Sequence, residues 1–156
     1  MQSFIFTNVV LLFGGRMTER KFWKIVAGHK EARENAPDDI KSILLGDWLR
    51  YNYVAIGWGA DNPQHRVFKE DMHEGDGVVV VTDGFIWAIG SITGEFKEKK
   101  LPEGSQLYPF QKGVVWYKVT KLSYDNFEKP LKNKLGANRT INELTADQWE
   151  SIAIRI

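Results

Sequence analysis

The side chains best suited to metal binding or acid–base chemistry in this sequence are three histidines, His29, His65 and His73. Their spacing does not fit the HExxH pattern, and the chain contains no cysteine, which excludes thiolate nucleophiles and cysteine-ligated zinc. Adjacent Asp38 and Asp39 stand at a predicted helix start, where acidic side chains complement the helix dipole. The residue types therefore predict no metal, no cofactor and no catalytic residue, and we expect that the chain is not an enzyme.

The six tryptophans are more informative than the titratable residues. In the stretch YNYVAIGWGAD, residues 51–61, an apolar run passes through Gly57 directly into Trp58 and Gly59. Trp23 stands in a similar place before a glycine turn, so both rings are able to line the mouth of a pocket. A nucleobase stacked on such a ring gains about 1–3 kcal/mol, although spacing alone leaves open whether Trp58 binds a ligand. Of the others, Trp116 and Trp149 are expected in the core, and Trp48 and Trp87 fit either the core or the site.

The elements that position these side chains fit one domain, which we place at residues 17–156. Residues 1–16 are interpreted as either a translated leader or an extra edge strand, because Met17 is a second candidate start. A hydrophobic content of 43% with 26% charged residues is typical of a globular protein. The net charge of +1 gives no strong overall field, so any contact with nucleic acid must be local.

Apolar runs bounded by turn residues predict five strands. Val78 to Val81 is typical of a core strand because it is continuously β-branched. Asp83-Gly84 is a two-residue hairpin signal, and Gly90 in the returning strand indicates a bulge. The predicted strands span residues 21–27, 53–57, 78–81, 85–93 and 114–122.

Helical segments are predicted between and after these strands. Pro37 near a helix start and Gly46 past its end bound one of them, and a short helical piece ends near Met72. Residues 140–143 and 145–148 both fit the capping-box pattern, and the second opens a helix. The sum is an α+β fold: five to six strands form a curled β-barrel flanked by helices.

The chain contains, in this order, FWKIVAG (Phe22–Gly28), YVAIGWG (Tyr53–Gly59), MHEGDGVVVV (Met72–Val81), IWAIGSITGEF (Ile86–Phe96) and VVWYKV (Val114–Val119). This order resembles EVE domains of the PUA-like superfamily, and the resemblance covers residues 21–156. The nearest likeness is to the McrB-type N-terminal DNA-recognition domains of modification-dependent restriction systems. YTH domains are more distantly similar. The resemblance implies a PUA-like or EVE-type fold.

In that family a tryptophan between strand and loop forms one wall of an aromatic cage that receives a flipped base. The resemblance implies that Trp58 is this wall and that Lys24 and the turn at 27–29 contact the base edge. Tyr108 and Phe110 are the aromatic residues available for a further wall. The full set of base-binding candidates, with Trp48 and Trp87 as reserves, is Trp23, Lys24, Ala27, Gly28, His29, Trp48, Trp58, Gly59, Trp87, Tyr108 and Phe110.

Phosphate contacts are expected from local basic clusters, although each cluster also fits an ordinary solvated face. The expected partners are nucleic acid and a motor or nuclease subunit of a restriction system. The apolar N-terminal run is too short to span a bilayer, and the lack of cysteine suits a reducing compartment, so we expect a cytoplasmic protein without membrane contact. The basic candidates are Arg66, Lys69, Lys97, Lys99, Lys100 and Arg139. Lys129, Lys132 and Lys134 belong to the same cluster as Arg139.

The sequence thus predicts a non-enzymatic module that reads a modified base by flipping it into an aromatic cage. N6-methyladenine or a methylcytosine in DNA is favoured, with a role in restriction and defence. One alternative is an RNA-binding PUA- or ASCH-like module whose affinity is independent of methylation. A second is a small nucleotide-processing enzyme of the same fold, which requires a displaced pKa at Asp61, Asp83 or Lys24 inside the pocket. A third is an interaction module whose exposed tryptophans bury against another protein.

Overall fold

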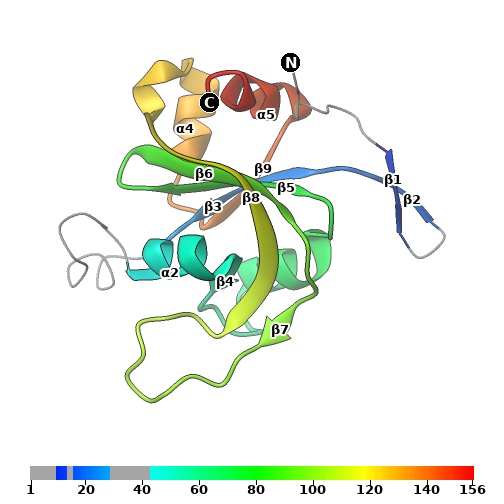
Figure 1. Cartoon of the computed structure of the whole chain (residues 1–156), viewed down its shortest axis with the longest axis vertical. Helices are drawn as coiled ribbons and strands as arrows, with labels where there is room; N and C mark the ends of the chain where they lie inside the picture. Colours follow the sequence, from blue (N-terminus) through cyan, green and yellow to red (C-terminus); the bar gives the residue numbers. More distant parts are fainter. Residues whose placement is uncertain (1–9, 14–15, 29–42) are drawn as a thin grey trace.

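The computed structural model describes residues 10–13, 16–28 and 43–156. His29 and the predicted start of the first helix lie outside these residues. Figure 1 shows a curled sheet with helices on both of its faces, which confirms the predicted α+β architecture. The strands of the main sheet are β3 (Phe22–Val26), β4 (Tyr53–Ile56), β5 (Gly77–Thr82), β6 (Phe85–Ile92), β8 (Phe110–Ser123) and β9 (Ile141–Leu144), and the short β7 (Lys97–Glu98) pairs with β8.

The strand order in the sheet is β4-β8-β6-β5-β3-β9. The β3 and β5 strands are parallel, whereas the other neighbouring pairs are antiparallel. The 14-residue β8 strand pairs with β4 through Phe110–Gly113 and with β6 through Val114–Ser123, which curls the sheet into a half-barrel. As a result, the ends of β3 and β4 and the chain that enters β9 border one cavity, although they lie far apart in the sequence.

Side chains of β5 alternate between two hydrophobic cores. Val78 and Val80 pack with Trp23 in one core, and Val79 and Val81 pack with Phe22 in the other. Because both faces of the strand are buried, its sequence is a continuous apolar run and not an alternating one. The second core lies under α4 (Lys129–Leu135) and α5 (Ala146–Ala153), and the first under α2 (Ile43–Tyr51), α3 (Pro63–Arg66) and the π-helix η1 (Val67–Asp71) (Figure 1).

The helix prediction was wrong at two positions. The α2 helix runs through Gly46 and ends only at Tyr51, after which Asn52 adopts a left-handed φ of 60°. Thr140, predicted to cap a helix, instead precedes β9, because residues 141–144 gain a full strand pairing with β3. The second predicted capping box is confirmed, since the Thr145 side chain accepts from the Gln148 backbone N–H at the start of α5.

The predicted hairpin and bulge are both confirmed. Asp83 and Gly84 adopt φ values of 54° and 83°, the left-handed pair that a tight two-residue turn between β5 and β6 requires. The β6–β8 register shifts between Ile89 and Gly90. A Cβ atom on Gly90 would lie 2.3 Å from the Val115 carbonyl oxygen, so only glycine fits this close approach.

Two further segments lie outside this architecture. The strands β1 (Val10–Phe13) and β2 (Arg16–Glu19) pair with each other as an antiparallel hairpin separate from the main sheet. Figure 1 shows this hairpin projecting from the side of the domain, next to β3 along the chain. The 3-10 helix η2 (Tyr124–Asn126) connects β8 to the segment before α4.

Candidate functional site

The cavity of interest, about 290 Å³ in volume, lies at the ends of β3 and β4. All four residues of β4 are buried, and the strand ends just before Gly57. Trp58 follows it and stays 48% exposed, whereas the other tryptophans are buried or half-buried. The buried strand therefore ends two residues before Trp58, whose side chain borders the cavity. The lining residues are Val26, Gly28, Gly57, Trp58, Tyr108 and Thr140.

Trp58 is held in place by two hydrogen bonds. Its indole Nε1 donates to the Thr140 Oγ1 atom at 3.2 Å, and its backbone carbonyl lies 2.8 Å from the Nδ1 atom of His65. Because a carbonyl only accepts, His65 Nδ1 carries the proton in this contact. His65 is buried and packs edge-on against the Phe110 ring, with 4.6 Å between centroids. The exposed indole is thus anchored on a buried support.

Tyr108 provides a second aromatic wall, and Gly57 makes room for it. A Cβ atom added to Gly57 would lie 3.0 Å from Cδ1 and 3.2 Å from Cε1 of Tyr108. The Tyr108 ring therefore lies directly over the backbone of Gly57, the residue that precedes Trp58. The rings of Trp58 and Tyr108 border the same cavity. This close approach explains a glycine immediately before the exposed tryptophan.

The prediction that the Trp23 ring lines a pocket mouth was wrong. Trp23 is only 4% exposed, and its Nε1 donates to the buried Asp76 carboxylate at 2.9 Å. Trp48, a reserve candidate, is fully buried in the core beneath α2. Both rings are packed inside the first hydrophobic core, so neither is able to stack on a ligand.

The turn after β3 contributes less than the resemblance implies. The Lys24 side chain is fully buried, and its Nζ donates to the carbonyl oxygens of Ala137 and Arg139 at 3.2 and 2.6 Å. Burial lowers the pKa of Lys24 to about 8. Ala27 is also fully buried, with its N–H bonded to the Val81 carbonyl. Within the described part of this turn, Gly28 alone reaches the cavity.

The remaining aromatic candidates serve other places. Trp87 donates from Nε1 to the Thr82 carbonyl at 2.9 Å and borders a different hollow, about 740 Å³, beside α2. Phe110 lies behind the site, where it supports His65. Gly59 accepts a hydrogen bond from the Asn62 N–H in the turn before α3. Of the predicted base-binding set, the structure brings Gly28, Trp58 and Tyr108 to one cavity.

Sequence reasoning missed three positions that shape the site. Thr140 was assigned to a helix cap, although it accepts from the Trp58 indole. His65 belongs to no recognisable motif, yet it is buried and its ring contacts the Trp58 carbonyl. Val26 lines the cavity from the end of β3. The one available signal was the break in apolar pattern at Gly28, which marks where β3 ends.

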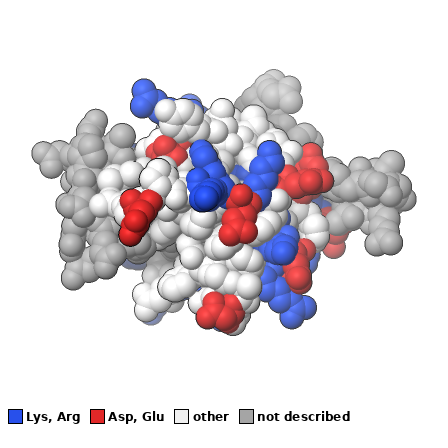
Figure 2. All heavy atoms as spheres, turned by 90° about the horizontal axis from the view of Figure 1, so that it is seen from below, with Lys and Arg blue, Asp and Glu red and all other residues white. Residues whose placement is uncertain are grey.

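The basic candidates do not form one patch. Arg66 pairs with Glu70 at 3.1 Å, Lys132 pairs with Asp125 at 2.6 Å, and Lys134 donates to the Gln148 amide at 2.9 Å. On the face seen from below in Figure 1, Lys and Arg side chains alternate with Asp and Glu (Figure 2). Arg139 differs because it is exposed and directly precedes Thr140 of the cavity. Apart from the paired Arg66 and Lys132, the other exposed candidates are Lys69, Lys97, Lys99, Lys100 and Lys129.

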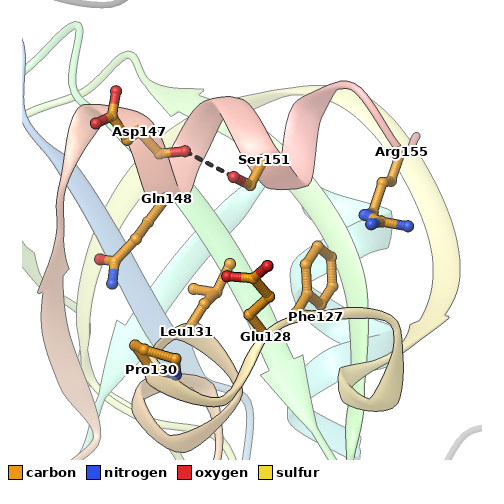
Figure 3. Close-up of a pocket in the computed structure, with 8 residues that line it drawn as sticks. All are labelled: Phe127, Glu128, Pro130, Leu131, Asp147, Gln148, Ser151 and Arg155. Carbon is orange, nitrogen blue, oxygen red and sulfur yellow. Dashed lines mark hydrogen bonds between the residues drawn. The ribbon is translucent and has the colours of Figure 1, made fainter.

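Another hollow, about 320 Å³, lies between α4 and α5 (Figure 3). Glu128, Asp147 and Arg155 line it, and Ser151 Oγ donates to the Asp147 carbonyl at 2.9 Å. The aromatic ring among its lining residues, Phe127, is buried, and the Arg155 guanidinium lies 5.4 Å from its centroid. Carboxylates at the rim and a covered ring make this hollow unsuited to a stacked base or a phosphate.

Neither a metal centre nor a membrane-spanning helix is found among the described residues. No three His, Asp or Glu side chains in the described part of the chain are grouped to hold a metal ion. Among the same residues, no helix is long and apolar enough to cross a bilayer.

Comparisons with known proteins address the fold. Neither a scan of protein-family models nor a search of curated sequences finds a match. Among solved structures, the YTH domain protein Mmi1 in complex with RNA aligns with a TM-score of 0.57 at 12% identity, covering 94% of this chain and 88% of that one. The YTH domain of Zygosaccharomyces rouxii MRB1 with N6-methyladenosine RNA gives 0.53 at 17% identity, covering 85% and 84%.

The chain has a YTH-like fold. A third structure, Rpa0253 from Rhodopseudomonas palustris, aligns with a TM-score of 0.51 at 12% identity, covering 86% of this chain and 91% of that one. At such identities the YTH-like fold is what the likeness establishes. The narrower expectation of an EVE domain of the McrB type stays a prediction.

Proposed function

We propose that this YTH-like domain reads a methylated base in nucleic acid by receiving the flipped base in the cavity between Trp58 and Tyr108. The observation that carries the proposal is an exposed indole, anchored to Thr140 and backed by His65, that shares an open cavity with a second ring. Exposing a tryptophan to water is unfavourable unless a ligand covers it, so a stacking role accounts for its position.

The energetics of base flipping fit such a cavity. Extruding a base from a duplex costs a few kcal/mol, and stacking on aromatic rings recovers about 1–3 kcal/mol per base. A methyl group buried between the rings adds about 0.8 kcal/mol, which is the margin for discrimination against the unmethylated base. The walls of the cavity are largely apolar, so they favour a methylated base edge over a bare amine.

N6-methyladenine is the first base we propose, and methylcytosine the second. The N6-methyladenosine in the MRB1 complex supports this order, because that protein shares the fold. DNA is the nucleic acid that we propose, on the basis of the motif resemblance to McrB-type modules. If DNA is bound, the chain acts beside a motor or nuclease subunit in a restriction system. RNA is the alternative strand, as in the Mmi1 and MRB1 complexes.

The enzyme alternative requires a titratable group with a displaced pKa inside the cavity. Lys24 has a lowered pKa, yet its Nζ is buried and bonded to two backbone carbonyls, and Lys24 does not line the cavity. Neither Asp61 nor Asp83 lines the cavity. We therefore propose binding without catalysis.

The test is fluorescence anisotropy with end-labelled oligonucleotides, which avoids interference from the protein's own tryptophans. Matched DNA and RNA strands carrying adenine or N6-methyladenine are titrated with the wild type, Trp58→Ala and Tyr108→Ala. We expect at least a tenfold loss with Trp58→Ala, equivalent to about 1.4 kcal/mol. Tyr51→Ala is the control, because Tyr51 is 63% exposed but lies on α2, outside the cavity. Equal binding of all strands by all four proteins would remove the proposal.

A further inference from the structure

A second cavity of about 410 Å³ adjoins the first. Val26, Gly28, Trp58 and Thr140 border both, so the hydrogen-bonded Trp58–Thr140 pair is common to the two. The remaining walls come from the β5–β6 hairpin and from the chain between α4 and β9. The hairpin contributes Thr82, Asp83 and Gly84, the chain before β9 contributes Ala137 and Asn138, and Tyr124 of η2 completes the wall.

The chemistry of the second cavity differs from that of the first. The Asp83 carboxylate and the Asn138 amide line it, and no lysine or arginine does so among the described residues. The Thr82 Oγ1 atom on the same wall is buried without a hydrogen-bond partner, which is rare for a buried hydroxyl. Carboxylate and amide oxygens accept hydrogen bonds, so the cavity suits a group rich in donors.

The walls of the second cavity are held firmly. Asp83 sits in the tight hairpin turn, and the Gly84 carbonyl accepts the Tyr124 N–H at 3.1 Å. In the chain before β9, the Ala137 and Arg139 carbonyls both accept from Lys24 Nζ, which fixes the chain on either side of Asn138. The cavity is therefore a feature of the folded domain and not of a single loose loop.

We propose that the second cavity is a subsite for the nucleotide adjacent to the flipped base, with the Asp83 carboxylate accepting a hydrogen bond from that nucleotide. The donor is a sugar hydroxyl or an exocyclic amine of the neighbouring base. This inference rests on the proposed function, because the shared Trp58 wall places the two nucleotides side by side. The exposed Arg139, between Asn138 of one cavity and Thr140 of the other, is positioned for the phosphate that joins them.

The experiment compares a single nucleotide with a short strand by isothermal titration calorimetry. The probes are N6-methyladenosine monophosphate and the trinucleotide adenosine–N6-methyladenosine–adenosine, in ribose and deoxyribose forms. The variant is Asp83→Asn, because asparagine also tolerates the left-handed φ of 54° and keeps the hairpin turn. Asp61→Asn is the matched control, since Asp61 is exposed near Trp58 in the sequence but lines neither cavity.

We expect Asp83→Asn to weaken trinucleotide binding roughly three- to tenfold and to leave the monophosphate affinity unchanged. A loss confined to the ribose strand identifies a sugar hydroxyl as the donor, whereas a loss in both strands identifies an adenine amine. Unchanged trinucleotide binding by Asp83→Asn overturns the subsite while the proposed function stands. If the wild type binds neither probe, the proposed function fails and the subsite fails with it.

Discussion

The buried lysine Lys24 gives the most direct physical test of this structure. Its side chain is fully buried, and burial lowers its pKa from 10.5 to about 8. Lys112, only 5% exposed and bonded through Nζ to the Lys69 and Met72 carbonyls, has a pKa lowered to about 8 by the same cause, partly offset by Asp76. Each lysine thus loses its proton about 2.5 pH units lower in the folded chain than in the unfolded chain.

The sign of the effect follows from proton counting. Between pH 8 and pH 10.5 the unfolded chain binds more protons at these lysines than the folded chain, so the free energy of unfolding rises with pH. Each lysine raises the free energy of unfolding by up to about 1.4 kcal/mol per pH unit in this window. Over the whole window this amounts to roughly 3 kcal/mol for each lysine. The raised pKa of the Tyr124 hydroxyl, caused first by burial and then by Asp83, opposes the rise above about pH 10, where unfolded tyrosine ionises.

The measurement is urea denaturation at half-unit steps from pH 7 to pH 10. The wild type should gain stability between pH 8 and pH 10, Lys24→Met should keep about half of that slope, and Lys24→Met with Lys112→Met should lose it. The slope is the relevant quantity because methionine also removes the hydrogen bonds to two carbonyls, which shifts stability by a constant at each pH. A flat wild-type profile, or an unchanged slope in Lys24→Met, would refute the argument that Lys24 is buried and charged.

Three further predictions concern the site and the sheet. Gly57→Ala should weaken binding of the methylated strand at least threefold in the anisotropy assay, because its Cβ would lie 3.0 Å from Cδ1 of Tyr108 and displace that ring; unchanged affinity would contradict the two-ring cavity. Arg139→Gln should reduce the slope of log affinity against log salt by about 0.7–0.9, and an unaltered slope would show that Arg139 contacts no phosphate. Gly90→Ala should lower the free energy of unfolding by about 2 kcal/mol or more, because the added Cβ would lie 2.3 Å from the Val115 carbonyl, and a wild-type denaturation midpoint would contradict the bulge geometry.

Local patterns predicted much of the fold. The β-branched run 78–81, the Asp83-Gly84 turn and the Thr145 capping box depend on neighbours in sequence, and each appears as predicted. The pattern at Thr140 misled, because a T-x-x-E sequence is compatible with a strand when a partner such as β3 lies alongside. The sequence of one segment alone does not predict which distant segment it pairs with as a strand.

The same division applies to the candidate site. Trp23 and Trp58 both stand near a glycine turn at the end of an apolar strand, so local sequence does not distinguish them. The difference arises from Asp76, which lies 53 residues from Trp23 and accepts its indole N–H in the core. Tyr108 joins Trp58 only because β4 pairs with β8, which brings the chain before β8 beside Gly57.

By itself, the sequence determined the five central strands and the last helix, since these follow from periodicity, turn residues and caps within a few positions, whereas β9 formed through its pairing with β3. The tertiary structure alone decided which aromatic rings face solvent, which lysines are buried and which side chains share a cavity. These outcomes depend on contacts between residues far apart in the chain. The surroundings of the exposed Trp58 indole are one such outcome, because the folded chain places Tyr108, Thr140 and an open cavity around it.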